Sequence, residues 1–414
     1  MIRKLLTGML LCFSTSTAAA EEPQALNEEQ VFRRWLSSSV EVASWRSQIG
    51  AARFDVVTAR LLPNPELMLS VNQLVNGYAP DAKTGYTAQL TVPLPIFGQR
   101  GARREAAEAL VSVAEANTLG TLWQRASDIQ GEMVEQAFAD AHVSMYEKNL
   151  TELARVRKII ETRTAAGANS AYDVLRVNAA ETTARAALRA ATTERMAAES
   201  RLLALVADPS LDRARITREG LVAFQGPENE TGLVAMAMER RPDLALARRS
   251  QVAAERSAER WRKDAIPTPS VFGAAYLVEG PQGFVVTGGV NIPLPVFDRN
   301  QGQVGRATTE AQMNELAAKS LEVRIKNEVQ GAWRAREAAR AALKEFRDAS
   351  LPTANELLRR AEVTYQAGTF SIADLFDAYR AMWEVRAQEL DLEKQMATAE
   401  ATLERAAVLL PISR

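Results

Sequence analysis

The sequence predicts a mainly helical protein with a smaller β contribution, built as two copies of one unit. The segment Thr91–Phe97, which reads Thr-Val-Pro-Leu-Pro-Ile-Phe, recurs at residues 291–297 as Asn-Ile-Pro-Leu-Pro-Val-Phe. Each copy follows a stretch of alternating apolar and polar residues and precedes a very long, proline-poor stretch rich in Ala, Glu and Arg. A repeated junction of this kind indicates an internal duplication, in which each unit contains a helix, a β-hairpin and a pair of long helices.

Residues 1–20 have the pattern of a secretory signal peptide. Two basic residues precede the apolar run Leu5–Phe13, and Ala18–Ala20 supplies an Ala-x-Ala cleavage site. We therefore expect the mature chain to be exported. Cys12 is the single cysteine and lies inside this peptide, so the mature chain would hold neither disulfides nor thiolate metal sites.

The charge pattern argues against one class of partner. The chain has 50 Lys and Arg against 51 Asp and Glu, interspersed rather than grouped. A net charge near zero gives no electrostatic basis for binding nucleic acid. No stretch after the signal peptide approaches 18 consecutive apolar residues, so we expect no transmembrane helix.

The first unit is expected over residues 21–208. It would comprise a helix at 26–62, a strand hairpin at about 64–95 and a helix pair at about 99–207. The first long helix would extend for about 100 Å. Gly167 would end it as a C-cap, and Ser170 would cap the next helix with Asp173 three residues on.

The second unit is expected over residues 209–414, with a hairpin at about 269–295 and a helix pair at about 299–410. Pro242 follows Arg241 where a helix should begin. Gly368, Ser371 and Asp374 repeat the capping pattern of the first unit at one offset of 201 residues. Pro352 is expected to interrupt and kink the long helix before them.

The strands alternate in a way that suits a membrane barrel. The four residues Tyr86, Ala88, Leu90 and Val92 share one face of a strand, opposite polar neighbours. Strands of about nine or ten residues can cross a bilayer when tilted. Four strands of a soluble sheet would alternate equally well, and Phe272 and Tyr276 fall on the face expected to be polar. Since four strands cannot close a barrel, the barrel interpretation requires an oligomer.

Three motifs, two of which recur at matching positions in the two units, resemble a known family over essentially the whole mature chain. They are Arg241-Pro242-Asp243-Leu244, the junctions Phe97-Gly98-Gln99-Arg100 and Phe297-Asp298-Arg299, and the helix tips at residues 166–173 and 367–374. The family is that of the TolC-type outer-membrane efflux factors. The resemblance implies a homotrimer whose chains each give four strands to a twelve-stranded outer-membrane barrel in contact with lipid. Their long helices would continue it as a periplasmic coiled-coil tunnel.

The resemblance also implies a function. Such a duct catalyses nothing and needs no cofactor; an inner-membrane pump of the RND type and a periplasmic adaptor protein would supply its substrates. The Pro-Leu-Pro-Ile-Phe-Gly-Gln-Arg junction is most similar to the heavy-metal resistance branch of the CzcC and CusC kind, so the substrates would include metal cations. A type I protein-secretion duct is an alternative within the family. An exported coiled-coil scaffold is the alternative outside it.

By resemblance, the helix tips carry the site residues. Gly167, Ser170, Gly368 and Ser371 would meet the adaptor, and Asp374, Asp377, Asp173 and Tyr365 would form a periplasmic gate. Capping alone could explain Asp374, because Asp173 holds the same position in the first unit.

Capping does not explain Asp377, whose counterpart in the first unit is Arg176. A carboxylate present in only one of two copies suggests a ring around the axis. We find no catalytic constellation and no metal site in the sequence. The single histidine, His142, has no second imidazole or thiolate to join it.

Overall fold

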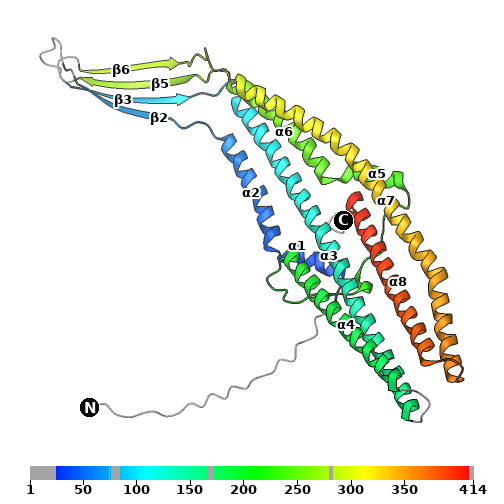
Figure 1. Cartoon of the computed structure of the whole chain (residues 1–414). Helices are drawn as coiled ribbons and strands as arrows, with labels where there is room; N and C mark the ends of the chain where they lie inside the picture. The colour runs from blue at the N-terminus through cyan, green and yellow to red at the C-terminus, as the bar shows by residue number, and fades with distance from the viewer. Residues whose placement is uncertain (1–24, 74, 76–83, 166–170, 279–282, 410–414) are drawn as a thin grey trace, which may run out of the picture.

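The computed structural model describes residues 25–73, 75, 84–165, 171–278 and 283–409. The predicted signal peptide and the tip residues Gly167 and Ser170 lie outside this part of the chain. The described chain is elongated, with a four-stranded sheet at one end and the ends of two long helix pairs at the other (Figure 1).

The order of helix, hairpin and helix pair occurs twice, as the repeated junctions predict. The first half contains β1 (Ala25–Leu26), α1 (Glu28–Ser38), α2 (Val40–Arg60), β2 (Glu66–Gln73), β3 (Thr84–Pro93), α3 (Gln99–Ala165) and α4 (Ala171–Val206). The second half contains β4 (Arg215–Ile216), the 3-10 turn η1 (Arg218–Gly220), α5 (Glu230–Arg240), α6 (Pro242–Asp264), β5 (Ser270–Val278), β6 (Phe284–Asn291), α7 (Gln301–Gln366) and α8 (Ile372–Ala407).

The four long strands form one antiparallel sheet in the order β2-β3-β5-β6, so the β3–β5 pair joins the two hairpins. The register places apolar residues opposite one another across all four strands. One such row runs Leu69, Ala88, Ala275, Val286. Residues directly opposite share a face, so the predicted apolar faces combine into a single apolar face of the sheet.

Two aromatic residues interrupt the alternation of β5 because the neighbouring strands offer glycines beneath them. A Cβ atom at Gly85 would collide with the ring of Tyr276, and one at Gly289 would collide with the ring of Phe272. Aromatic side chains that cover a strand glycine in this way fill the space left by the absent side chain. The irregular pattern therefore reflects packing on the second face of the sheet.

The helices below the sheet form a layer in the same order as the strands. α2 packs along α3, α3 along α6, and α6 along α7, which leaves α2 and α7 as the two edges of the layer (Figure 1). α4 pairs with α3, α8 pairs with α7, and α3 also contacts α8. These contacts bury the apolar stripes that helices of this length need in order to be stable.

The expectation of one helix over residues 26–62 is wrong, because the chain bends at Ser39. Ser39 has an extended backbone and separates α1 from α2, and β1 precedes them. The bend lets α1 bury Trp35 and Phe32 in the main core, where α1 meets α3 and α4, while α2 follows α3 toward the sheet.

The predicted interruption at Pro352 is also wrong. α7 passes through Pro352 as one helix. A proline removes one backbone hydrogen bond from the helix. The extended packing of α7 against α8 holds the helix on both sides of it.

The predicted helix start at Pro242 is confirmed, and the residue before it links the two halves. Pro242 occupies the first turn of α6. Arg241 is buried, with its guanidinium 4.8 Å from the ring centre of Trp123 on α3. It forms ion pairs of 2.8 Å with both Asp243 and Glu328. A buried cation needs such partners, so Arg241 links α3, α6 and α7.

Candidate functional site

The second helix tip, residues 367–374, has the capping geometry that the sequence predicts. α7 ends at Gln366 with Ala367 as its C-cap, and Gly368 follows with φ of +79°. No atom lies within 4 Å of the position that a Cβ would take at Gly368. Its backbone conformation, rather than lack of space, therefore favours glycine there.

Ser371 and Asp374 form a capping box at the start of α8. The Asp374 N–H donates to the Ser371 hydroxyl at 3.3 Å, and the Ser371 N–H donates to the Asp374 carboxylate at 3.0 Å. The Ser371 hydroxyl also donates to that carboxylate at 2.6 Å. These hydrogen bonds hold the pKa of Asp374 below its usual value, so the carboxylate stays charged at neutral pH. The capping role of Asp374 is confirmed.

Asp377 has a different environment. Its side chain is 57% exposed, and its Oδ1 lies 3.5 Å from the Arg176 guanidinium of α4. Arg176 also lies over the ring of Phe376, 5.8 Å from its centre. The two charged residues at equivalent positions of the two halves thus meet within one chain.

The other two predicted gate residues lie close to the tip. Tyr365 is buried, with the Arg163 guanidinium 4.4 Å from its ring centre and donating to its carbonyl at 3.3 Å. Asp173 lies half-buried in the first turn of α4. A hydrogen bond between Tyr365 and Asp173 stays a prediction.

A polar cluster that sequence reasoning did not predict links the two halves above the tip. Arg155 of α3 donates to the Tyr379 hydroxyl at 2.7 Å and to Glu362 at 3.2 Å. The Tyr379 hydroxyl donates to Glu362 at 2.5 Å. Burial and the neighbouring carboxylate raise the pKa of Tyr379, so the hydroxyl remains a donor. The position equivalent to Arg155 in the second half is Glu356, so no repeated motif pointed to this cluster.

His142 is held by its own chain. Its Nδ1 lies 2.9 Å from the Phe138 carbonyl and its Nε2 lies 3.4 Å from Asp391. Within the described residues, no three His, Cys, Asp or Glu side chains are placed to hold a metal ion together.

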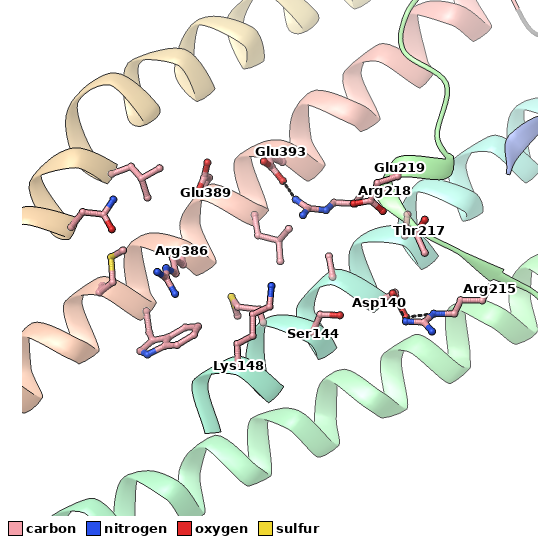
Figure 2. A pocket seen from close by; sticks show the side chains of 18 residues that line it. Asp140, Ser144, Lys148, Arg215, Thr217, Arg218, Glu219, Arg386, Glu389 and Glu393 are labelled. Atoms are coloured by element: carbon pink, nitrogen blue, oxygen red, sulfur yellow. Dashed lines mark hydrogen bonds and ion pairs between the residues drawn. The ribbon is translucent and has the colours of Figure 1, made fainter. Parts of the chain in front are cut away.

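A cavity of about 730 Å³ lies beside α3 and α8, next to β4 and η1 (Figure 2). Two of its carboxylates are paired with arginines: Asp140 with Arg215 at 3.0 Å, and Glu393 with Arg218. Lys148 and Arg386 point into the same space (Figure 2). The paired carboxylates tie the segment between the two halves to the long helices. Because they are committed to arginines, they form no general acid–base pair.

The geometry defines a class of protein. In the part of the chain that the structure describes, no helix has an apolar stretch suited to crossing a bilayer. The sheet instead exposes its apolar face in the single chain, with Leu69 and Val286 each 71% exposed. A large exposed apolar surface of this kind marks a contact with membrane or protein. A sheet of this type continued by a long helical layer is the architecture of a membrane duct subunit.

The chain belongs to the outer membrane efflux protein family, whose model matches residues 32–208 and 233–407. The cobalt-zinc-cadmium resistance protein CzcC of Cupriavidus metallidurans is 27% identical over 377 residues, covering 89% of this chain and 86% of that protein. The solved structure of CusC shares the fold with a TM-score of 0.75 and 18% identity, over 92% of each chain.

The open-state structure of the Neisseria gonorrhoeae MtrE outer membrane channel is similar to the same degree. Its TM-score is 0.75 at 19% identity, over 92% of this chain and 88% of that one. The chain is therefore an outer-membrane efflux channel protein of the CzcC and CusC type, with its helical part in the periplasm, and it is not an enzyme.

Proposed function

We propose that three copies of this chain close into a passive duct that carries substrates across the outer membrane. An inner-membrane pump of the RND type would deliver the substrates through a periplasmic adaptor. The observation that carries this proposal is the sheet, which exposes an apolar face and has two unpaired edges, β2 and β6. Unpaired edges are not tolerated in lipid, so β6 of one chain must pair with β2 of the next.

The helical layer is open at the same two places as the sheet. Its edge helices carry exposed apolar side chains, with Phe54 of α2 74% exposed and Met313, Leu316 and Val323 of α7 also exposed. Burying these against a neighbouring chain is favourable. Joining α7 to α2 would close the helices as joining β6 to β2 closes the strands, so one arrangement of copies satisfies both.

The proposed substrates are metal cations, because CzcC is a cobalt-zinc-cadmium resistance protein. A duct of this kind needs no high-affinity metal site, since conduction requires that an ion also leave.

The proposed gate lies at the helix tips. Asp374 and Asp377 would face the axis with Asp173 and Tyr365 beside them. Gly167, Ser170, Gly368 and Ser371 would meet the adaptor. Three copies of the carboxylates gathered around one axis would repel each other and favour a multivalent cation.

Planar bilayers test this function. Wild-type protein purified from outer membranes should conduct cations in preference to anions and be blocked by trivalent cations added from the periplasmic side. The double variant Asp374→Ala, Asp377→Ala should conduct without that block. A protein that forms no conducting pore would contradict the duct, and an unchanged block would place the constriction elsewhere.

A further inference from the structure

We infer that Arg176 and Asp377 form a closed ring of alternating charges around the tip of the duct. In this ring each Asp377 lies between the Arg176 of its own chain and the Arg176 of the neighbouring chain. The inference rests on the proposed trimer and assigns a residue to the gate, Arg176, that the proposed function does not use. It also gives Asp377 a role different from that of Asp374.

The ring begins from a pair that the single chain already contains. Arg176 of α4 and Asp377 of α8 lie 3.5 Å apart, nitrogen to oxygen. They are related by the same offset of 201 residues that relates Gly167 to Gly368 and Ser170 to Ser371. They are therefore equivalent positions of the two halves that carry opposite charges.

Among the ion pairs between the halves in the described part of the chain, this one alone joins equivalent positions. α4 and α8 have 36 residues each, and α3 and α7 have 67 and 66, so the two helix pairs are near copies. Three chains around an axis would place six such pairs in a circle. Within a chain, the first half contacts the second half. The second half of that chain would then contact the first half of the neighbouring chain in the same way.

When a contact within a chain joins equivalent positions of the two halves, the corresponding contact between chains joins the same two residue types. Asp377 therefore meets Arg176 of the neighbouring chain. The cluster above the tip behaves differently: the repeat of Arg155 with Glu362 would be Glu356 with Glu161 of the neighbouring chain, which cannot form an ion pair. Of these two levels, only that of Arg176 gives attraction at both kinds of contact.

The single chain leaves room for the second partner. More than half of the Asp377 side chain is exposed, and its ion pair with Arg176 is made through Oδ1. Leu175, next to Arg176, is 66% exposed, whereas its equivalent Phe376 packs into the tip cluster that joins the two halves. An apolar residue that is covered in one half and bare in the other is expected where a neighbouring chain supplies the missing cover.

In this ring Asp377 and Asp374 have different roles. Arg176 balances the charge of Asp377 on both sides, so Asp377 holds adjacent helix pairs together. Asp374 has its capping partner but forms no ion pair among the described residues. The cation affinity of the constriction should then depend mainly on Asp374.

Cross-linking between chains tests the ring directly. The one native cysteine, Cys12, lies in the predicted signal peptide, so introduced cysteines would be the only ones in the mature protein. Chains with Arg176→Cys and chains with Asp377→Cys, each with its own tag, would be co-expressed and oxidised in the membrane. We expect dimers that carry both tags, and none from either variant expressed alone.

Co-expressed Arg155→Cys and Glu362→Cys chains are the matched control, because that pair should link only within a chain. If Arg176→Cys and Asp377→Cys chains gave no mixed dimer although the double variant linked within one chain, the ring would be excluded and the duct would stand. Loss of the trimer on a native gel without oxidation would instead count against the proposed function.

Charge reversal gives a second readout. Arg176→Asp or Asp377→Arg would place six like charges at one level, and the closed state seen as low bilayer conductance should be lost. The swap of both residues restores the alternation and should restore wild-type conductance. A swap that behaves like the single reversals would overturn the ring.

Discussion

Arg155 of α3 donates a hydrogen bond of 2.7 Å to the hydroxyl of Tyr379 on α8, 224 residues further along the chain. The same hydroxyl donates to Glu362 of α7. One phenol therefore connects a cation of the first half to a carboxylate of the second. Because Tyr379 is buried, these polar groups depend on one another for their hydrogen bonds.

Replacing Tyr379 with Phe should loosen the contact between the two helix pairs. The change removes the hydroxyl but leaves the ring, so the apolar packing is kept. We expect a loss of about 1–2 kcal/mol per chain, because Arg155 and Glu362 lose a buried partner. Thermal unfolding of the detergent-solubilised protein, with hydrogen exchange along α8, would measure it.

Tyr146→Phe on α3 is the control, since the Tyr146 hydroxyl forms no hydrogen bond within the described residues. The two variants differ by the same atom, so equal stability for both would show that the Tyr379 hydroxyl contributes nothing.

Glu28 makes stability depend on pH. Its side chain is buried, accepts from the Val222 N–H at 3.0 Å and from Gln130 at 3.2 Å, and forms no ion pair within the described residues. Burial raises its pKa above the ordinary value of 4.5. Since the folded state binds this proton more tightly than the unfolded state, the contribution of Glu28 to stability falls as pH rises from 4.5 through the raised pKa.

The variant Glu28→Gln should therefore be more stable than wild type near pH 8, by about 1 kcal/mol. Thermal midpoints at pH 5 and pH 8 would measure the gain, which should shrink at the lower pH. Glu29→Gln, at an exposed position, should change neither value; a Glu28→Gln variant less stable than wild type at pH 8 would refute the explanation.

Replacing Gly368 with Leu should weaken adaptor docking. The residue sits at φ of +79°, where a non-glycine side chain costs about 1–2 kcal/mol, and Leu would add bulk at the tip. We expect lower export-dependent resistance in the host at an unchanged outer-membrane level. Gly368→Asn is the control, because Asn tolerates this conformation and is smaller. Wild-type resistance in the Leu variant would mean that the adaptor binds elsewhere.

Much of the fold was predictable because duplication repeats each local signal. Gly368, Ser371 and Asp374 could be placed because capping requires particular residue types at fixed spacing, and the structure has them in those roles. The bend at Ser39 could not be placed, because it depends on the burial of Trp35 in a core assembled from distant segments. The predicted interruption of α7 at Pro352 was wrong for a related reason, since packing against α8 outweighs a single missing hydrogen bond.

The candidate site shows the same limit. The opposite charges of Arg176 and Asp377 were visible at equivalent positions, but their contact required knowing how the two helix pairs face each other. The Arg155, Glu362 and Tyr379 cluster has no repeated counterpart, so only the structure could bring it together. Contacts between the halves are tertiary, whereas caps and strand alternation are local.

In the proposed trimer, neighbouring chains join edge to edge, β6 to β2 and α7 to α2, until the sheet has no open edge. The most direct test is the mass of the protein extracted from outer membranes in mild detergent, measured by native mass spectrometry. We expect one species of three chains. A protein that is a single chain, and that stays in solution without detergent, would contradict it.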